Sequence, residues 1–203
     1  MAPQLSPQMQ EHRQKRLLTV AMEVFAEKGY HDTSVDDILE RAEIARGTFY
    51  RYFDNKRDCF AQALDYFFEQ MMNFIRPLDI SELSLEQYQS LFRTLSRSVL
   101  NNPGNRKFTR LVLLEAPTLG TDFRDRIDRF FDSLVNLVAA YIRKAVDKGR
   151  IAPIDPVSAA HGVLGLGKEA LLLWYRNDPA KPGVDTLIEN LLQLAFFGMM
   201  PRK

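Results

Sequence analysis

The chain has 203 residues, of which 46% are hydrophobic and 26% charged, and its formal net charge is +1. This composition is typical of a globular protein with a sizeable core, and it excludes a DNA affinity that comes from bulk positive charge. The one cysteine, Cys59, excludes an intrachain disulfide and fits a reducing compartment. Because we find neither a signal-peptide pattern nor a run of about 20 uncharged apolar residues, we expect a cytoplasmic protein without a membrane partner.

Hydrophobic side chains recur at helical spacing along most of the chain, and glycines, prolines and capping residues separate the segments. In the first segment Leu17, Ala21, Val24 and Phe25 lie on one face, and Gly29 ends the pattern. There is no convincing strand or hairpin signal. The pattern predicts helices over residues 11–28, 56–75, 85–100, 106–116, 122–148, 156–177 and 184–199, with a helix–turn–helix within residues 37–57.

The helix–turn–helix segment has the features of a DNA-reading unit. Ile38 and Leu39 are apolar on the first helix, and Phe49 and Phe53 lie four residues apart on the second, so they form one inner face. The residues between the two phenylalanines must then point outward, where small, polar and basic side chains can reach DNA. The candidate DNA-binding residues are Thr33, Ser34, Arg46, Gly47, Thr48, Tyr50, Arg51, Tyr52 and Lys56.

The chemistry of these residues assigns each a role at the DNA. Arg46 can donate two hydrogen bonds to a guanine edge, and Gly47 lets a partner backbone approach closely. Tyr50 suits a phosphate oxygen, and Lys56 adds its charge to the positive end of the next helix. The hydroxyls that precede the first helix, those of Thr33 and Ser34, can cap that helix, contact a phosphate, or do both.

The stretch ARGTFYRYFDNKRDCFAQAL closely resembles the DNA-binding signature of the TetR family of bacterial transcriptional regulators. The preceding stretch AMEVFAEKGYHDTSVDDILERA is similar to the first helix, glycine–aromatic turn and capped second helix of that family. The resemblance covers about the first third of the chain. It implies an all-α fold with an N-terminal helix-turn-helix three-helix head at residues 11–71 and a C-terminal helical ligand-binding and dimerisation body at residues 72–203.

Two residues depart from the family pattern. Glu43 stands in the turn where glycine is common, and a left-handed backbone there would cost about 1 kcal/mol. Ala45 stands where a serine often caps the recognition helix, so a capping bond worth about 1 kcal/mol is missing. The absent serine also puts in doubt any phosphate contact that the family makes through it.

The segment GVLGLGKEALLLWY is apolar nearly all round, and its only charges are Lys168 and Glu169. A helix that is apolar on all sides must be buried on all sides, either in the core of a monomer or against a second copy of the chain. The resemblance implies a homodimer, which would read a double-stranded palindromic operator with half-site centres about 34–36 Å apart or a multiple of that distance. The candidate dimer-interface residues are Gly162, Gly165, Leu172, Leu187, Leu191 and Leu194.

The resemblance also implies an unknown small-molecule inducer that binds in the body and releases DNA by a population shift. The many Phe and Met residues suggest an apolar or aromatic ligand. The alternative for each candidate is plain core packing, and Glu115 can instead pair with an arginine. The candidate ligand-binding residues are Phe67, Met71, Phe92, Phe108, Glu115, Phe131, Leu134, Tyr141, His161 and Trp174.

The expected function is that of a repressor, which dissociates from DNA when it binds its ligand. The alternatives are an activator, a redox-responsive regulator that acts through Cys59, and an all-α enzyme. A redox role would gain support if the neighbouring Arg57 lowered the pKa of Cys59. For an enzyme, the three histidines are far apart, and the HExxH, CxxC and GxSxG patterns are absent. The sequence therefore predicts no catalytic residue, metal site or cofactor.

Overall fold

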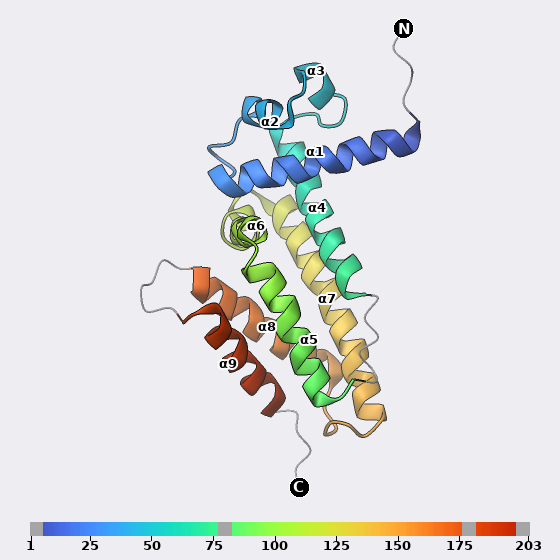
Figure 1. The fold of residues 1–203 in the computed structure, drawn as a ribbon. Helices are drawn as coiled ribbons and strands as arrows, with labels where there is room; N and C mark the ends of the chain where they lie inside the picture. The colour runs from blue at the N-terminus through green and yellow to red at the C-terminus, as the bar shows by residue number, and fades with distance from the viewer. Residues whose placement is uncertain (1–5, 77–82, 176–181, 198–203) are drawn as a thin grey trace. The chain divides into compact units, whose positions relative to one another are not determined.

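The computed structural model describes residues 6–76, 83–175 and 182–197, and in these ranges it contains helices and no strand (Figure 1). The all-α fold is thereby confirmed. No helix in the described ranges is long and apolar enough to span a lipid bilayer. The helices are α1 (Pro7–Lys28), α2 (Val35–Ala42), α3 (Arg46–Phe49), α4 (Lys56–Ile75), α5 (Leu85–Leu100), α6 (Pro103–Leu114), the 3₁₀ turn η2 (Ala116–Thr118), α7 (Thr121–Asp147), α8 (Pro156–Tyr175) and α9 (Val184–Phe197).

The helices α1 and α6 begin well before the residues at which the sequence pattern predicts them, because short side chains cap them. Ser6 accepts a hydrogen bond from the Met9 amide at 3.3 Å, and Pro7 occupies the first turn of α1. Asn102 accepts hydrogen bonds from the amides of Gly104 and Asn105 at 3.0 and 3.1 Å, so α6 begins at Pro103. The ends of the last two predicted helices, at residues 176–177 and 198–199, lie outside the described residues.

The chain divides into two compact units, and the boundaries fall within α4, α6 and α7. The first unit comprises Met1–Met71 and Lys107–Arg126, and the second comprises Met72–Arg106 and Ile127–Lys203. Residues 107–126, which we expected in the C-terminal body, therefore pack with the N-terminal head.

An aromatic cluster forms the core of the first unit. Phe60 of α4 is fully buried, and its ring centroid lies 4.9 Å from those of Phe25 and Tyr30 and 5.3 Å from that of Phe123. These rings come from α1, the α1–α2 turn, α4 and the start of α7. Residues more than 90 positions apart in the chain thus share one core, which supports the helices that carry the helix–turn–helix.

The second unit is held by packing of α7 on α8 and by ion pairs between α5 and α9. Val135, Ala139 and Ile142 of α7 pack around Ala160 of α8. Arg93 donates two hydrogen bonds to Glu189, at 2.6 and 2.8 Å. Only one face of α8 is buried by these contacts, and its opposite face remains exposed in the single chain.

Candidate nucleic-acid interface

The second helix is capped at its start by a reciprocal pair of hydrogen bonds. The Asp37 amide donates to the Ser34 hydroxyl at 3.1 Å, and the Ser34 amide donates to the Asp37 carboxylate at 2.8 Å. Capping of α2 was one of the roles that the sequence allowed for Ser34. The Lys28 ammonium, 2.6 Å from the Asp37 carboxylate, and the Ser34 hydrogen bonds hold the pKa of that carboxyl well below its usual range. The start of α2 is therefore fixed against α1.

The turn between α2 and α3 contains the strained residue that the sequence indicated. Glu43 has a left-handed backbone, with φ 52° and ψ 46°, and its amide donates to Glu40 and Leu39 carbonyls. Ala45 precedes α3 and makes no side-chain capping bond. Both departures from the family pattern thus have their expected structural consequence.

Replacing Glu43 with glycine is expected to raise the free energy of unfolding by roughly 1 kcal/mol, because glycine adopts the left-handed conformation without strain. For a chain of this size the melting temperature should rise by about 2–4 °C, as measured by circular dichroism. Glu40→Gly, at an exposed position inside α2, is the matched control and should destabilise by about 1 kcal/mol. A loss of stability in both variants would contradict strain at Glu43.

The third helix is a single turn, and Phe49 at its end and Phe53 beyond it are buried, whereas polar side chains of the same segment are exposed. Phe49 and Phe53 are 0% and 1% exposed, and their ring centroids are 5.0 Å apart. Gly47 is exposed, with no atom within 4 Å of the place where a Cβ would stand. Tyr50 is 47% exposed. Exposed or half-buried on the same segment are the other candidates Arg46, Thr48, Arg51 and Tyr52.

Arg46 is not free in the single chain, because its guanidinium pairs with the Asp36 carboxylate of α2. Both side chains are more than half exposed, so water screens the pair and its net stabilisation is small. Nothing in the sequence indicated this pair. If Arg46 contacts a guanine, it must first leave Asp36.

The structure corrects the role expected for Thr33. Its side chain is 2% exposed, and its hydroxyl donates to the Gly29 carbonyl at 2.7 Å. A buried hydroxyl that is already bonded within the turn is not available to a phosphate. Ser34 is exposed, but its hydroxyl serves the capping box.

Lys56 lies at the start of α4 and points to the protein's own backbone. Its ammonium donates to the carbonyls of Tyr30, His31 and Thr33 at 2.9, 3.2 and 2.7 Å. It also lies 4.6 Å from the centroid of the Tyr30 ring. These contacts give Lys56 a structural role in the α1–α2 turn that the sequence did not reveal.

The ten candidate ligand residues are distributed over both units. Phe67, Met71, Phe108 and Glu115 belong to the first unit, and the other six belong to the second. Phe67 and Phe108 pack against each other at 5.1 Å between ring centroids, as ordinary core residues do. In the second unit Leu134 and Trp174 are buried, and Phe92, Phe131 and Tyr141 are half-buried.

The two polar ligand candidates have different surroundings in the described part of the chain. The Glu115 carboxylate accepts a hydrogen bond from the Tyr30 amide at 3.3 Å and lies 3.9 Å from the Arg110 guanidinium. His161 is exposed on α8. Glu115 therefore belongs to the head, and it lies near an arginine, as the alternative interpretation of this residue expected. His161 is on the surface of the single chain.

The predicted dimer-interface residues include both exposed and buried positions. Leu187 is 7% exposed and packs inside its own chain, so it cannot contact a second copy directly. Leu172 and Leu191 are half-buried. Gly162 and Gly165 are exposed, with open space at each Cβ position, and Leu194 is 62% exposed.

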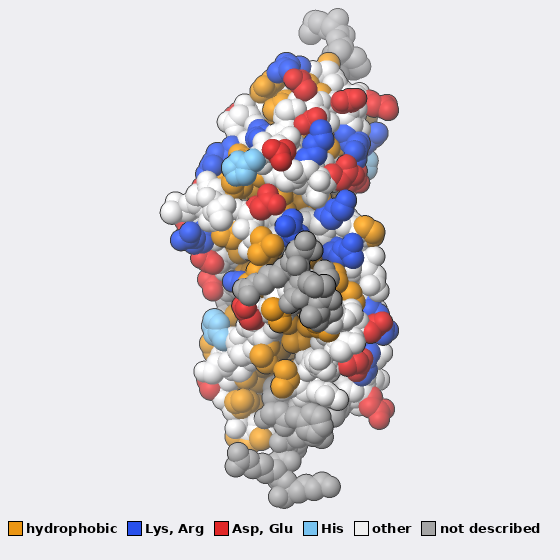
Figure 2. Space-filling model, turned by 90° about the vertical axis from the view of Figure 1, so that its left-hand side faces the viewer, with side chains coloured by type: hydrophobic (Ala, Val, Ile, Leu, Met, Phe, Trp, Pro, Cys, Tyr) orange, Lys and Arg blue, Asp and Glu red, His pale blue; other side chains and the backbone are white. Residues whose placement is uncertain are grey.

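The exposed face of α8 includes two leucines as well as the two glycines. Leu166 and Leu173 are 44% and 50% exposed, and they lie with Gly162 and Gly165 at spacings that place all four on one side of the helix. Figure 2, which views the side of the molecule that carries α8 and α9, shows hydrophobic side chains gathered on this unit.

The environment of Cys59 does not support a redox role. The side chain is fully buried, and burial, with a smaller contribution from Asp58, raises the pKa of the thiol to about 12. Arg57 does not provide the support that a redox role would need, because its guanidinium points away to Asp122 at 2.5 Å. A buried thiol with a raised pKa is a poor nucleophile.

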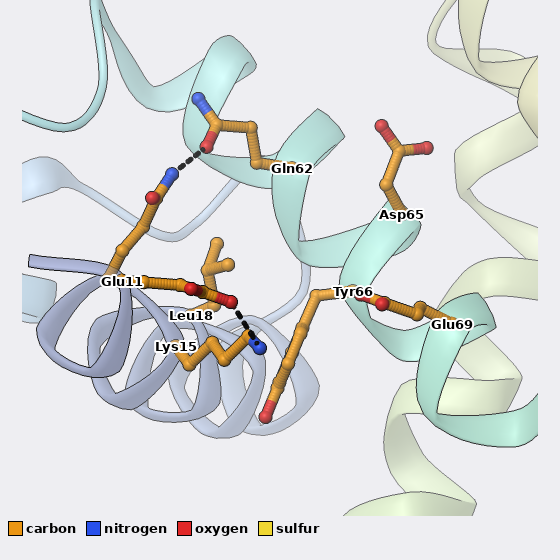
Figure 3. A pocket seen from close by; sticks show the side chains of 8 residues that line it. Glu11, Lys15, Leu18, Gln62, Asp65, Tyr66 and Glu69 are labelled. Atoms are coloured by element: carbon orange, nitrogen blue, oxygen red, sulfur yellow. Dashed lines mark hydrogen bonds and ion pairs between the residues drawn. The ribbon is translucent and has the colours of Figure 1, made fainter. Parts of the chain in front are cut away.

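A shallow recess of about 250 Å³ lies between α1 and α4 in the first unit (Figure 3). Gln14 donates to Gln62 across it at 2.7 Å, and Lys15 pairs with Glu11 at 2.7 Å. Lys15 and Glu11 are thus already paired with each other, and none of the candidate ligand residues lines the recess. Within the described ranges we also find no group of side chains that could hold a metal ion.

Comparison with known proteins gives one consistent result. The family model described as bacterial regulatory proteins, tetR family, matches residues 17–63. A fatty acid metabolism regulator protein of Bacillus subtilis is 27% identical over 196 residues, which cover 94% of this chain and 98% of that protein.

Solved structures show the same fold over nearly the whole chain. The transcriptional regulator FadR from Bacillus subtilis in complex with stearoyl-CoA has a TM-score of 0.75 at 24% identity, covering 92% of this chain and 98% of that one. The fatty acid degradation regulator FadR from Bacillus halodurans has a TM-score of 0.74 at 22% identity, covering 95% and 96%.

Proposed function

Because this chain belongs to the TetR family and is a DNA-binding transcriptional regulator, we propose that it acts as a homodimeric repressor, which a small ligand releases from a palindromic operator. The observation that carries the proposal is the exposed surface of α3, where polar and basic side chains stand over the buried Phe49 and Phe53. A short helix presented in this way fits the major groove of DNA.

The side chains of α3 and the residues after it divide into two kinds of contact. Arg46 would read a guanine by two parallel hydrogen bonds, once it leaves Asp36. Gly47 would admit the DNA backbone, since its surroundings are open. Thr48, Tyr50, Arg51 and Tyr52 would contact phosphates, which position the helix but carry no sequence information.

A dimer is supported by the exposed face of α8. Gly162 and Gly165 let another helix approach closely, and Leu166 and Leu173 supply apolar area that a second copy would cover. An isologous interface places the same face of both copies together and relates the two α3 helices by a two-fold axis. The two-fold axis is the reason to expect a palindrome.

The proposed ligand is a long-chain acyl thioester of coenzyme A. The support is the relationship to the Bacillus subtilis fatty acid metabolism regulator protein over 94% of this chain, and a FadR structure that contains stearoyl-CoA. An acyl chain also agrees with the apolar class of ligand expected from the composition. A ligand releases DNA only if it binds the DNA-free conformation more tightly.

The first experiment is selection of bound fragments from random duplex DNA at about 0.15 M salt. An enriched palindrome with one fixed half-site spacing is the expected result. Stearoyl-CoA is then added to the complex with this DNA, and free coenzyme A is the control. Release by the thioester alone supports the ligand, whereas equal release by both, or by neither, excludes it. A single half-site without symmetry would exclude the palindromic operator.

Replacing Arg46 with alanine should relax specificity at one base pair of each half-site. Discrimination against the wrong base pair there should fall by roughly tenfold, since a bidentate contact contributes about 1–3 kcal/mol. Tyr50→Phe is the control, because losing a phosphate contact weakens binding to all sequences alike. The measurement is a set of dissociation constants for operators changed at single positions. Uniform weakening by Arg46→Ala would rule out base reading by Arg46.

A further inference from the structure

The α1–α2 turn is held by polar side chains from two distant segments of the first unit. From α4, the Lys56 ammonium donates to the carbonyls of Tyr30, His31 and Thr33. From the end of α6, the Glu115 carboxylate accepts the Tyr30 amide at 3.3 Å. The two side chains therefore satisfy backbone donors and acceptors of one short turn.

The contacts are too specific to be incidental surface pairs. All three Lys56 acceptors lie within 3.2 Å, and three is the full donor capacity of an ammonium. Glu115 also approaches Gly29 so closely that a Cβ there would lie 3.2 Å from its carboxylate oxygen. Gly29 itself has φ +83°, a conformation that favours glycine. Both the backbone conformation and the nearby Glu115 carboxylate thus favour glycine at this point.

This turn sets the position of the DNA-reading helices, because α2 begins directly after it. Thr33, whose carbonyl accepts from Lys56, is followed by Ser34, the N-cap of α2. We infer that Lys56 and Glu115 are positioning residues that clamp the α1–α2 turn, and that Lys56 supports DNA binding through this turn rather than by touching a phosphate. The inference rests on the proposed DNA-binding function and assigns a mechanism to that same surface.

The dependence of DNA affinity on salt separates the two roles of Lys56. A side chain that neutralises a phosphate releases a counterion, so its loss flattens the slope of log affinity against log salt by about one unit. A lysine bonded to protein carbonyls releases none. Lys56→Met should therefore weaken binding to the selected duplex on the order of tenfold, with the slope unchanged. A slope that flattens by about one unit would overturn the positioning role.

Glu115 gives an independent test through the sign of its effect. Removing a negative charge from a DNA-binding unit should tighten binding if charge alone matters. Loss of a clamp should instead weaken DNA binding. We expect Glu115→Ala to reduce the affinity for DNA by about threefold, which is about the square root of the tenfold effect of a typical hydrogen bond. Glu115→Gln keeps an acceptor for the Tyr30 amide and should bind nearly as the parent chain does. Affinity of Glu115→Ala equal to or above that of the parent chain would overturn the proposal.

Matched controls remove the effect of charge at a distance. Lys107→Met and Asp125→Asn delete exposed charges in the same unit without touching the turn, and they should leave specific binding within about twofold. Deuterium exchange of the amides at residues 30–34 provides a measurement without DNA. Exchange there should accelerate in Lys56→Met and Glu115→Ala, while α1 and α4 stay protected.

The exchange measurement also separates this inference from the proposed function. If the parent chain selects no DNA, the proposed function fails, and exchange still tests the clamp. If the parent chain binds DNA but exchange at residues 30–34 is unchanged in both variants, the clamp fails alone. Thermal unfolding of each variant shows whether the unit as a whole remains folded.

Discussion

If the chain forms the proposed homodimer, Leu173→Glu is expected to convert it to a monomer and to weaken binding to the proposed palindromic duplex by at least about 100-fold. The side chain is 50% exposed on the open face of α8, so a glutamate there costs little in the single chain. In a dimer the same position would place two buried carboxylates near each other across the two-fold axis, which is strongly unfavourable. The loss of affinity follows because two linked half-sites gain about 10²–10⁴ from their effective concentration.

Sedimentation gives the mass, and a titration of the palindromic duplex gives the affinity. Asn136→Glu introduces the same charge at an exposed position of α7 and should leave both unchanged. A Leu173→Glu protein that remains a dimer would show that this face of α8 is not the interface. A monomer that binds the palindrome with undiminished affinity would show instead that the dimer is not needed for reading DNA.

Phe60→Ala is expected to lower the free energy of unfolding by about 3–5 kcal/mol, the usual cost of removing a buried phenylalanine. The ring is fully buried and meets Phe25, Tyr30 and Phe123, which come from three different segments of the first unit. Neighbouring rings cannot collapse into the space without leaving their own contacts. The melting temperature should fall by roughly 10 °C.

Phe74→Ala in the same helix is the matched control, because that ring is 57% exposed. It should change the free energy of unfolding by less than about 1 kcal/mol. Urea unfolding followed by circular dichroism compares the two variants under one condition. Similar losses in both would mean that the aromatic cluster does not dominate the stability of the first unit.

The features that the sequence predicted well are those decided by residues close together in the chain. The capping box joins Ser34 to Asp37, and the left-handed Glu43 ends a helix whose last carbonyls lie three and four residues earlier. The apolar spacing of Phe49 and Phe53 likewise determines which side chains of α3 stay exposed. Local rules of capping and periodicity are sufficient for such features.

Contacts between distant segments were not predictable in this way. The Tyr30 amide meets Glu115 across 85 residues of chain, and nothing near Glu115 in the sequence indicates a backbone partner. We therefore interpreted Glu115 as a ligand group and placed residues 107–126 in the body. The sequence correctly placed Lys56 at the start of a helix. It cannot show whether the Lys56 ammonium faces DNA or the carbonyls of an earlier turn.

The alternative of a redox role for Cys59 loses its support for a geometric reason. Residues two apart on a helix point in different directions, so Arg57 and Cys59 do not face each other although they are close in sequence. Arg57 reaches the Leu119 carbonyl and Asp122, while Cys59 points into the core. Proximity in the chain is therefore no guide to the sign of the pKa shift of Cys59, which burial determines.

Because the Cys59 thiol is buried, its rate of chemical labelling can report how often the first unit opens. Cys59 is the only cysteine in the chain and is 0% exposed, so a thiol reagent reacts only when the unit opens. In the limit of fast closing, the labelling rate measures the equilibrium constant for opening. DNA that binds only the closed form slows labelling by the factor 1 + [DNA]/Kd. The binding of operator DNA to the unmodified protein can thus be followed by the decrease in the labelling rate of Cys59, without a fluorophore or an engineered label.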